Sequence, residues 1–190
     1  FLLAFLVVLF YARPLLDSLT LSYGGDAMSL LLPSLEHYKQ TVYNGIIPLW
    51  NFGAWLGAPF LATFQSSVLY PPQLLTLVFK SGYVAQNFMI LFSLVWLSWG
   101  AYLFGLRALQ LQRSAAMLLA LITACSGFVG GHMDHVNQLA TISWIPWVIT
   151  EALILLRRPQ VKGALLLAVC ICLQTLAGHP QYVAYTLVYL

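Results

Sequence analysis

The sequence predicts an all-α integral membrane protein: a polytopic helical bundle with a large first extracytoplasmic loop that carries interfacial helices. The chain is 61% hydrophobic and only 7% charged, whereas a soluble domain carries about 25% charged residues. Several apolar segments approach the roughly 20 residues that a helix needs to cross a bilayer. The basic residues gather in short loops between these segments, without the dense basic, aromatic-rich surface that would indicate nucleic-acid binding.

Six apolar segments are predicted to be spans of one multispan domain. The first and last are too short for a full crossing, and the chain begins without Met and ends within an apolar stretch, so we expect a longer protein with both outer spans cut. Pro146 is expected to kink the fourth span, and the glycines of 127–131 to break the third. The spans are expected at about 1–13, 83–106, 111–127, 136–156, 161–177 and 181–190.

The positive charges predict the orientation of these spans. Basic residues occur in the short loops 107–113 and 157–162, two spans apart, and the positive-inside rule assigns both loops to the cytoplasm. The loop 17–82 and the turns 127–137 and 178–181 then share the extracytoplasmic face, as expected for a multi-pass protein of the cell membrane. That face receives most of the carboxylates and all the histidines: Asp17, Asp26, Glu36, Asp134, His37, His132, His135 and His179. Side chains from three separate loops are thus candidates to converge there.

Residues 17–82 are predicted to form the functional loop. Its glycines and prolines forbid a continuous helix across lipid, and a loop of this length is usually functional. Within it, Pro33 to Tyr43 is predicted to be a helix lying at the membrane interface. Its apolar face is Leu35, Tyr38 and Val42, with Glu36, Lys39 and Gln40 pointing away. Its neighbours Trp50, Trp55, Tyr70 and Tyr83 fit the aromatic belt of an interface.

Asp26 is the first candidate for chemistry. It follows Gly24 and Gly25, which let the backbone bring a carboxylate close to a ligand. Such a carboxylate can act as a general base or hold a divalent cation. The alternative is a helix N-cap, a position that favours Asp, for a helix beginning at Ala27.

Two further turns carry histidines. His132, Asp134 and His135 lie within four residues, and such a group can bind a metal, orient a phosphate or relay a proton, although a polar turn at a helix end looks similar. His179 and Gln181 flank Pro180 in the other turn and are either substrate ligands or ordinary interfacial residues. Four loop residues are candidates to line a sugar or isoprenoid-phosphate pocket, against the simpler role of interfacial anchors: Trp50, Asn51, Gln65 and Tyr70.

Two other groups have plainer interpretations. Glu151 lies inside a predicted span, where an acid is a functional candidate by default, but pairing with Arg157 or Arg158 is the favoured interpretation. The cysteines lie in apolar segments, and those at 170 and 172 do not face each other on a helix, so they are interpreted as small packing residues and no disulfide framework is expected.

Motifs along almost the whole chain, in this order and spacing, resemble the YfhO family of bacterial membrane proteins, which is similar to the GT-C superfamily of glycosyltransferases. They are Gly25-Asp26, Pro48-Leu49-Trp50-Asn51, Gly57-Ala58-Pro59, Gln65 with Leu69-Tyr70-Pro71-Pro72, Ser126-Gly127-Phe128 with His132, His135 and Asn137, Trp144-Ile145-Pro146-Trp147, and Ala177-Gly178-His179-Pro180-Gln181. Phe52 departs from the pattern, which has Pro after Trp-Asn. Family members are also much longer, so parts of an active site are expected beyond this chain.

The resemblance implies a bundle of GT-C type that transfers a sugar from a polyprenyl-phosphate carrier to a glycan or other cell-envelope acceptor outside the cytoplasm. Asp26 would be the catalytic carboxylate, and His132 and His135 would contact the carrier phosphate or the acceptor. Metal dependence differs within the superfamily, so a divalent cation is a candidate cofactor, with Asp26 and Asp134 as candidate ligands. The alternatives are a transporter or flippase of lipid-linked sugar or polymer, and a non-catalytic assembly factor of the cell envelope.

Overall fold

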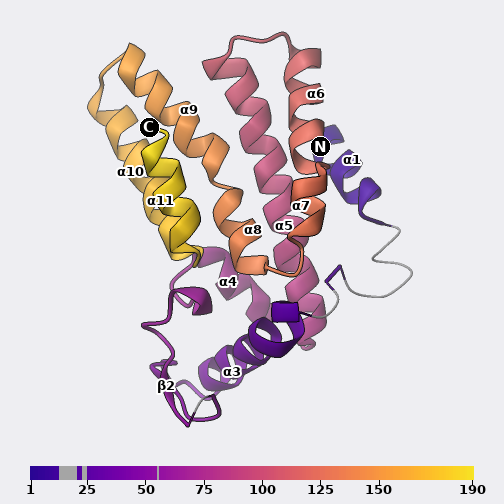
Figure 1. Cartoon of the computed structure of the whole chain (residues 1–190), viewed down its shortest axis with the longest axis vertical. Helices are drawn as coiled ribbons and strands as arrows, with labels where there is room; N and C mark the ends of the chain where they lie inside the picture. Colours follow the sequence, from indigo (N-terminus) through magenta and orange to yellow (C-terminus); the bar gives the residue numbers. More distant parts are fainter. Residues whose placement is uncertain (13–20, 23–24, 55) are drawn as a thin grey trace.

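The chain is mostly helical, and its long helices form a bundle (Figure 1). Shorter elements from the described part of residues 17–82, called the platform below, lie at one end of this bundle. The computed structural model describes residues 1–12, 21–22, 25–54 and 56–190. The predictions that concern Asp17, Gly24, Trp55 and the end of the first span at residue 13 lie outside these residues.

Among the described residues, three helices are long and apolar enough to cross a membrane. The longest runs from Gly82 to Ala108 and consists of α5 (Gly82–Leu103) and the π-helical segment η4 (Phe104–Ala108). The second comprises α6 (Arg113–Ala124) and α7 (Gly127–Gly131), and the third α8 (Val136–Ile142) and α9 (Ile145–Arg157). The shorter apolar helices α1 (Leu2–Phe10), α10 (Val161–Leu176) and α11 (Pro180–Val188) lie beside them.

The interruptions of these helices have identifiable causes. The predicted kink at Pro146 is confirmed: α8 ends at Ile142, and Pro146 occupies the first turn of α9, where a missing N–H costs nothing. The predicted break at residues 127–131 is wrong in detail. Those glycines form the extra turn α7, and the break lies just before it, where the Ser126 hydroxyl caps α7 by accepting a hydrogen bond from the Val129 N–H at 3.3 Å.

Helix α5 is the centre of the bundle and packs against α1, α6, α8 and α9. Its contact with α6 uses small residues: Ala116, Ala120 and Ala124 recur every fourth position and are fully buried. A Cβ added at Gly105 would lie 3.1 Å from the Cα of Ala116, so glycine permits the close approach.

Tryptophans join α5 to α9. Trp96 and Trp147 stack with ring centroids 4.4 Å apart, and Trp144 lies 5.1 Å from Trp96. The Trp144 indole donates a 3.0 Å hydrogen bond to the hydroxyl of Tyr70, which is completely buried. The bundle is therefore tied directly to the platform.

The platform consists of the described part of residues 17–82. It contains η1 (Ala27–Leu31, a π-helix), α3 (Leu32–Tyr43), the antiparallel pair β1 (Trp50–Asn51) and β2 (Ala58–Pro59), η2 (Phe64–Ser66), α4 (Pro71–Leu75) and η3 (Thr76–Val78). The predicted helix at 33–43 is confirmed. Its apolar side chains Leu35 and Tyr38 form a cluster with Phe60 and Ala85, so they pack against protein. Lys39 was predicted to point away and is instead buried, because its aliphatic stem packs inward and its ammonium donates to the Lys80 carbonyl at 3.0 Å.

The two ends of the bundle differ in charge. The α5–α6 and α9–α10 connections and the helix ends beside them, which carry five of the eight basic residues, lie together at one end (Figure 1). The platform, the turn between α7 and α8, and the turn between α10 and α11 lie at the other. The predicted grouping of three polar segments at one end is therefore correct.

Candidate functional site

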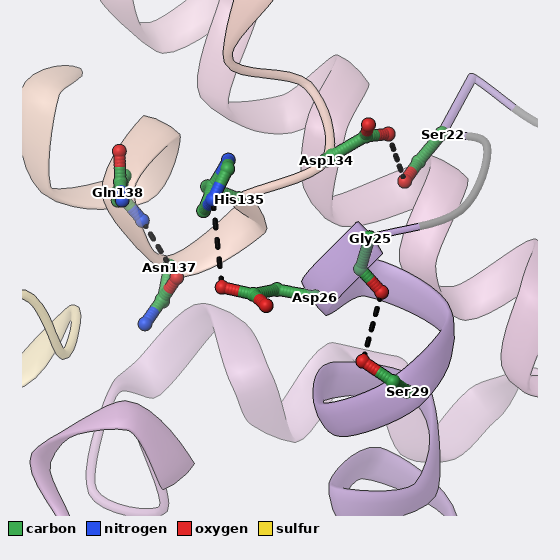
Figure 2. Close-up of polar contacts among 8 residues, drawn as sticks. All are labelled: Ser22, Gly25, Asp26, Ser29, Asp134, His135, Asn137 and Gln138. Atoms are coloured by element: carbon green, nitrogen blue, oxygen red, sulfur yellow. Dashed lines mark hydrogen bonds and ion pairs between the residues drawn. The ribbon is translucent and has the colours of Figure 1, made fainter.

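Asp26 and His135 meet where the platform contacts the bundle. The Oδ2 atom of Asp26 lies 3.5 Å from Nε2 of His135, and Figure 2 shows the side chains pointing toward each other from the start of η1 and from the residue before α8. The Asp26 side chain is 58% exposed and makes no capping hydrogen bond to the helix that follows it. The N-cap alternative is therefore not what holds this carboxylate, which can receive a proton from a ligand.

Asp134 lies beside this pair and has a different environment. Its Oδ1 accepts a 3.0 Å hydrogen bond from the Ser22 hydroxyl, which comes from the platform segment before Asp26 (Figure 2). A Cβ at Gly25, where φ is +52°, would lie 3.9 Å from Oδ2 of Asp134. Asp134 thus helps to hold the segment that carries Asp26 against the turn that carries His135.

The turn between α10 and α11 joins the same end of the bundle through glycine. Gly178 has a φ of +101°, and a Cβ there would lie 2.6 Å from the Phe64 carbonyl oxygen. The Ser67 hydroxyl donates to the Ala177 carbonyl at 2.8 Å, and the His179 N–H donates to Oγ1 of Thr141 at 3.2 Å. These contacts seat the turn on both the platform and α8.

His135 acts electrostatically on His179 at this junction. Burial lowers the pKa of His179 below its ordinary value, and His135 lowers it further. The Nδ1 atoms of both imidazoles are buried and have no hydrogen-bond partner among the described residues. Buried polar atoms are normally paired, so these two nitrogens are unsatisfied within the described part of the chain.

Two of the predicted histidine-turn residues face elsewhere. His132 packs on Phe128, with ring centroids 4.3 Å apart, and hydrogen-bonds to the Phe128 carbonyl at 2.7 Å. Its ring centroid remains 6.2 Å from that of His135. Gln181 is exposed and donates to the Tyr185 hydroxyl on the next turn of α11. These contacts occupy both side chains locally, whereas Asp26 pairs with His135, and His135 acts electrostatically on His179.

The predicted pocket residues of the loop separate into two groups. Trp50 is exposed on the hairpin, where its carbonyl accepts a 3.2 Å hydrogen bond from His37. Tyr70 was offered as an interfacial anchor, and this is wrong, because the ring is buried against the bundle; burial raises its pKa to about 12. Asn51 and Gln65 line a small cavity of about 40 Å³ between the hairpin and α3.

A second cavity, of about 50 Å³, lies between the platform and the bundle. Gln65 lines this cavity as well, together with Tyr70. Gln86 and Asn137 complete its polar wall and were not among the predicted site residues. Gln86 had a usable signal, since it is an amide near the start of an otherwise apolar span. Asn137 directly follows Val136 and lies near the Asp26–His135 pair in Figure 2.

The described residues contain no group of three His, Cys, Asp or Glu side chains that could hold a metal ion. The candidate metal ligands Asp26 and Asp134 have separate partners, His135 and Ser22. Asp26 with His135 could supply at most two ligands to a divalent cation, and a substrate phosphate would have to contribute others.

Glu151 pairs differently from the prediction. Its carboxylate lies 3.9 Å from the guanidinium of Arg107 in η4, and its side chain is only 12% exposed. Pairing with Arg157 or Arg158 was wrong because α9 packs against η4, which brings a cation from another helix alongside. The acid inside the span therefore has a structural partner at the basic end of the bundle.

Comparison with protein-family models, curated proteins and solved structures finds no match to the chain.

Proposed function

We propose that the protein is a membrane glycosyltransferase of GT-C type, which moves a sugar from a polyprenyl-phosphate carrier to an extracytoplasmic acceptor in the cell envelope. The observation that carries the proposal is the exposed, non-capping carboxylate of Asp26, 3.5 Å from His135, at the end of the bundle where three polar segments meet. The sequence resemblance to the YfhO family supports the same chemistry.

In this mechanism Asp26 is the general base. The oxygen of the acceptor hydroxyl attacks the anomeric carbon of the sugar, and its proton passes to Asp26. The bond between the anomeric carbon and the phosphate oxygen breaks, and the polyprenyl phosphate leaves with the electron pair. His135 orients the Asp26 carboxylate, and such positioned proton transfer contributes about 10²–10⁴-fold to a rate.

The leaving phosphate needs stabilisation from histidines or from a bound cation. The three segments at this end, residues 21–22 with 25–29, 131–138 and 178–181, contain no Lys or Arg. His135 and His179 would supply the donors, because an imidazole N–H can donate to a phosphate oxygen. A divalent cation held by Asp26, His135 and the phosphate itself is a second way to neutralise this charge.

Transfer from a labelled polyprenyl-phosphate sugar, measured in membranes at matched protein levels, tests the proposal. Asp26→Asn should lower transfer at least about 100-fold, because it removes the base with little change in shape. Glu36→Gln is the matched control and should retain transfer, because Glu36 lies in α3, outside these three segments.

Wild-type transfer by the Asp26→Asn variant would reject Asp26 as the base. Absence of transfer by the wild-type protein with several donor sugars would reject the enzyme class. Movement of a lipid-linked sugar in liposomes would then identify a transporter or flippase.

A further inference from the structure

The cavity of about 50 Å³ between platform and bundle borders every segment of the candidate site. Leu31 lies at the end of the π-helix that begins after Asp26. Val136 directly follows His135, and Ala177 lies two residues before His179. A ligand in this cavity would therefore lie next to the chain segments that carry the proposed reaction.

The wall of the cavity is polar but uncharged. None of its lining residues is acidic, basic or a histidine. Leu31, Met89 and Val136 contribute apolar surface. The polar members are amides and hydroxyls, and they include Gln65, Ser67, Tyr70, Gln73, Gln86 and Asn137. A charged group placed here would lose its hydration without gaining an opposite charge, whereas amides and hydroxyls can pair with neutral hydroxyl groups.

Gln86 gives the strongest indication that a hydrogen-bonding ligand belongs in this cavity. The residue is only 5% exposed, and its Nε2 atom has no hydrogen-bond partner among the described residues. A buried, unsatisfied amide is costly, and native proteins rarely keep one without a reason. Asn137 adds a second amide. Its oxygen accepts the Gln138 N–H at 3.0 Å, and its nitrogen points the other way (Figure 2).

We propose that this cavity binds one edge of an uncharged sugar ring, with Gln86 donating a hydrogen bond to a ring hydroxyl. A volume of about 50 Å³ holds roughly three to five water-sized groups at about 10–15 Å³ each, which suits the hydroxyl-bearing edge of a single ring. The proposal rests on the proposed glycosyl transfer and adds that the ring of the transferred or accepting sugar is neutral, so rings that carry a carboxylate, as in uronic acids, are rejected.

The test is saturation-transfer NMR on the protein in nanodiscs, with glucose and glucuronate as probes that differ by one carboxylate. The wild-type protein should saturate glucose and leave glucuronate unaffected. Gln86→Met should weaken glucose binding at least about tenfold, the equivalent of one lost hydrogen bond. Its unfolding temperature should equal or exceed that of the wild type, since an orphan amide is replaced by an apolar side chain of similar size.

Gln160→Met is the matched control, because Gln160 is exposed just before α10 and does not line the cavity, so glucose binding should be unchanged. The proposal is overturned if glucose gives no saturation transfer, if Gln86→Met binds glucose as the wild type does, or if glucuronate binds equally well. Asp26→Asn should still bind glucose, since Asp26 does not line the cavity. Loss of transfer and loss of sugar binding are therefore separable.

A competition experiment shows whether the bound ring is the donor sugar or the acceptor sugar. Displacement of glucose by an unlabelled polyprenyl-phosphate glucose would identify the cavity as the site of the donor sugar. Simultaneous binding of both would identify it as the acceptor site. Each of these results supports a neutral-sugar site.

Discussion

Replacement of Gly178 by alanine should displace the turn between α10 and α11 from its contacts with the platform and α8. The backbone at this position has a φ of +101°, which L-residues rarely adopt, and strain of this kind costs about 1–3 kcal/mol. The added Cβ would also lie 2.6 Å from the Phe64 carbonyl oxygen, which belongs to the backbone and cannot rotate away. Relief of that overlap would separate the Ser67 hydroxyl from the Ala177 carbonyl, a hydrogen bond of about 0.5–1.5 kcal/mol.

The expected loss of unfolding free energy is therefore about 2–4 kcal/mol. It can be measured by reversible unfolding in mixed micelles, followed by tryptophan fluorescence, for which the chain has six reporters. The same variant should lose the electrostatic influence of His135 on His179, because the turn that carries His179 moves away from α8.

Two glycine controls separate the strain from the overlap. Gly45→Ala has a positive φ of +71° and no atom within 4 Å of the new Cβ, so it should cost only the strain, about 1–2 kcal/mol. Gly130→Ala has open space within α7 and should be neutral or stabilising by up to about 1 kcal/mol. If Gly178→Ala destabilises no more than Gly45→Ala, the close packing of this turn on the platform is refuted.

Two other perturbations test how the platform is joined to the bundle. Tyr70→Phe leaves the buried Trp144 indole N–H without its acceptor and should lower the unfolding free energy by about 1–3 kcal/mol. A double-mutant cycle with Trp144→Phe should show coupling between the two substitutions. Additive effects on the unfolding free energy would contradict the hydrogen bond. Because the pKa of His179 is lowered mainly by burial and then by His135, the unfolded chain binds a proton there more readily than the native protein. The free energy of unfolding should fall as the pH drops below about 6.5, and His179→Gln should flatten that slope in unfolding curves recorded from pH 7.5 to 5.5; an unchanged slope would contradict the assignment.

The helices and their ends followed from local sequence properties. The apolar run after Gly82 predicted a span at 83–106, and the structure has helix from Gly82 to Ala108. The basic loops predicted which connections lie together, because charge separates the ends of a membrane bundle regardless of how its helices pack. That separation also brought Asp26, His135 and His179 to one end of the bundle.

The specific partners within that end depend on packing that local patterns do not encode. Glu151 has arginines six and seven residues away on its own chain segment, yet it pairs with Arg107, which a neighbouring helix places alongside. The burial of Tyr70 and of Gln86 likewise reflects how the platform docks on α5 and α8. Asp26 and His135 lie more than 100 residues apart, so their contact follows only from the tertiary fold.

The π-helix η1 sets the direction, around the helix axis, in which the Asp26 carboxylate points. A π-turn spans five residues where an α-turn spans four, so residues 27–31 contain one more residue than a regular helix joining Asp26 to α3 would need. Each residue turns a helix by about 100°. If the same residues were wound as a regular α-helix, the Asp26 carboxylate would rotate about a quarter of a turn around the axis, away from His135, while α3 kept its buried face. The π-turn therefore lets the Asp26 carboxylate point toward His135 while the buried face of α3 keeps its packing.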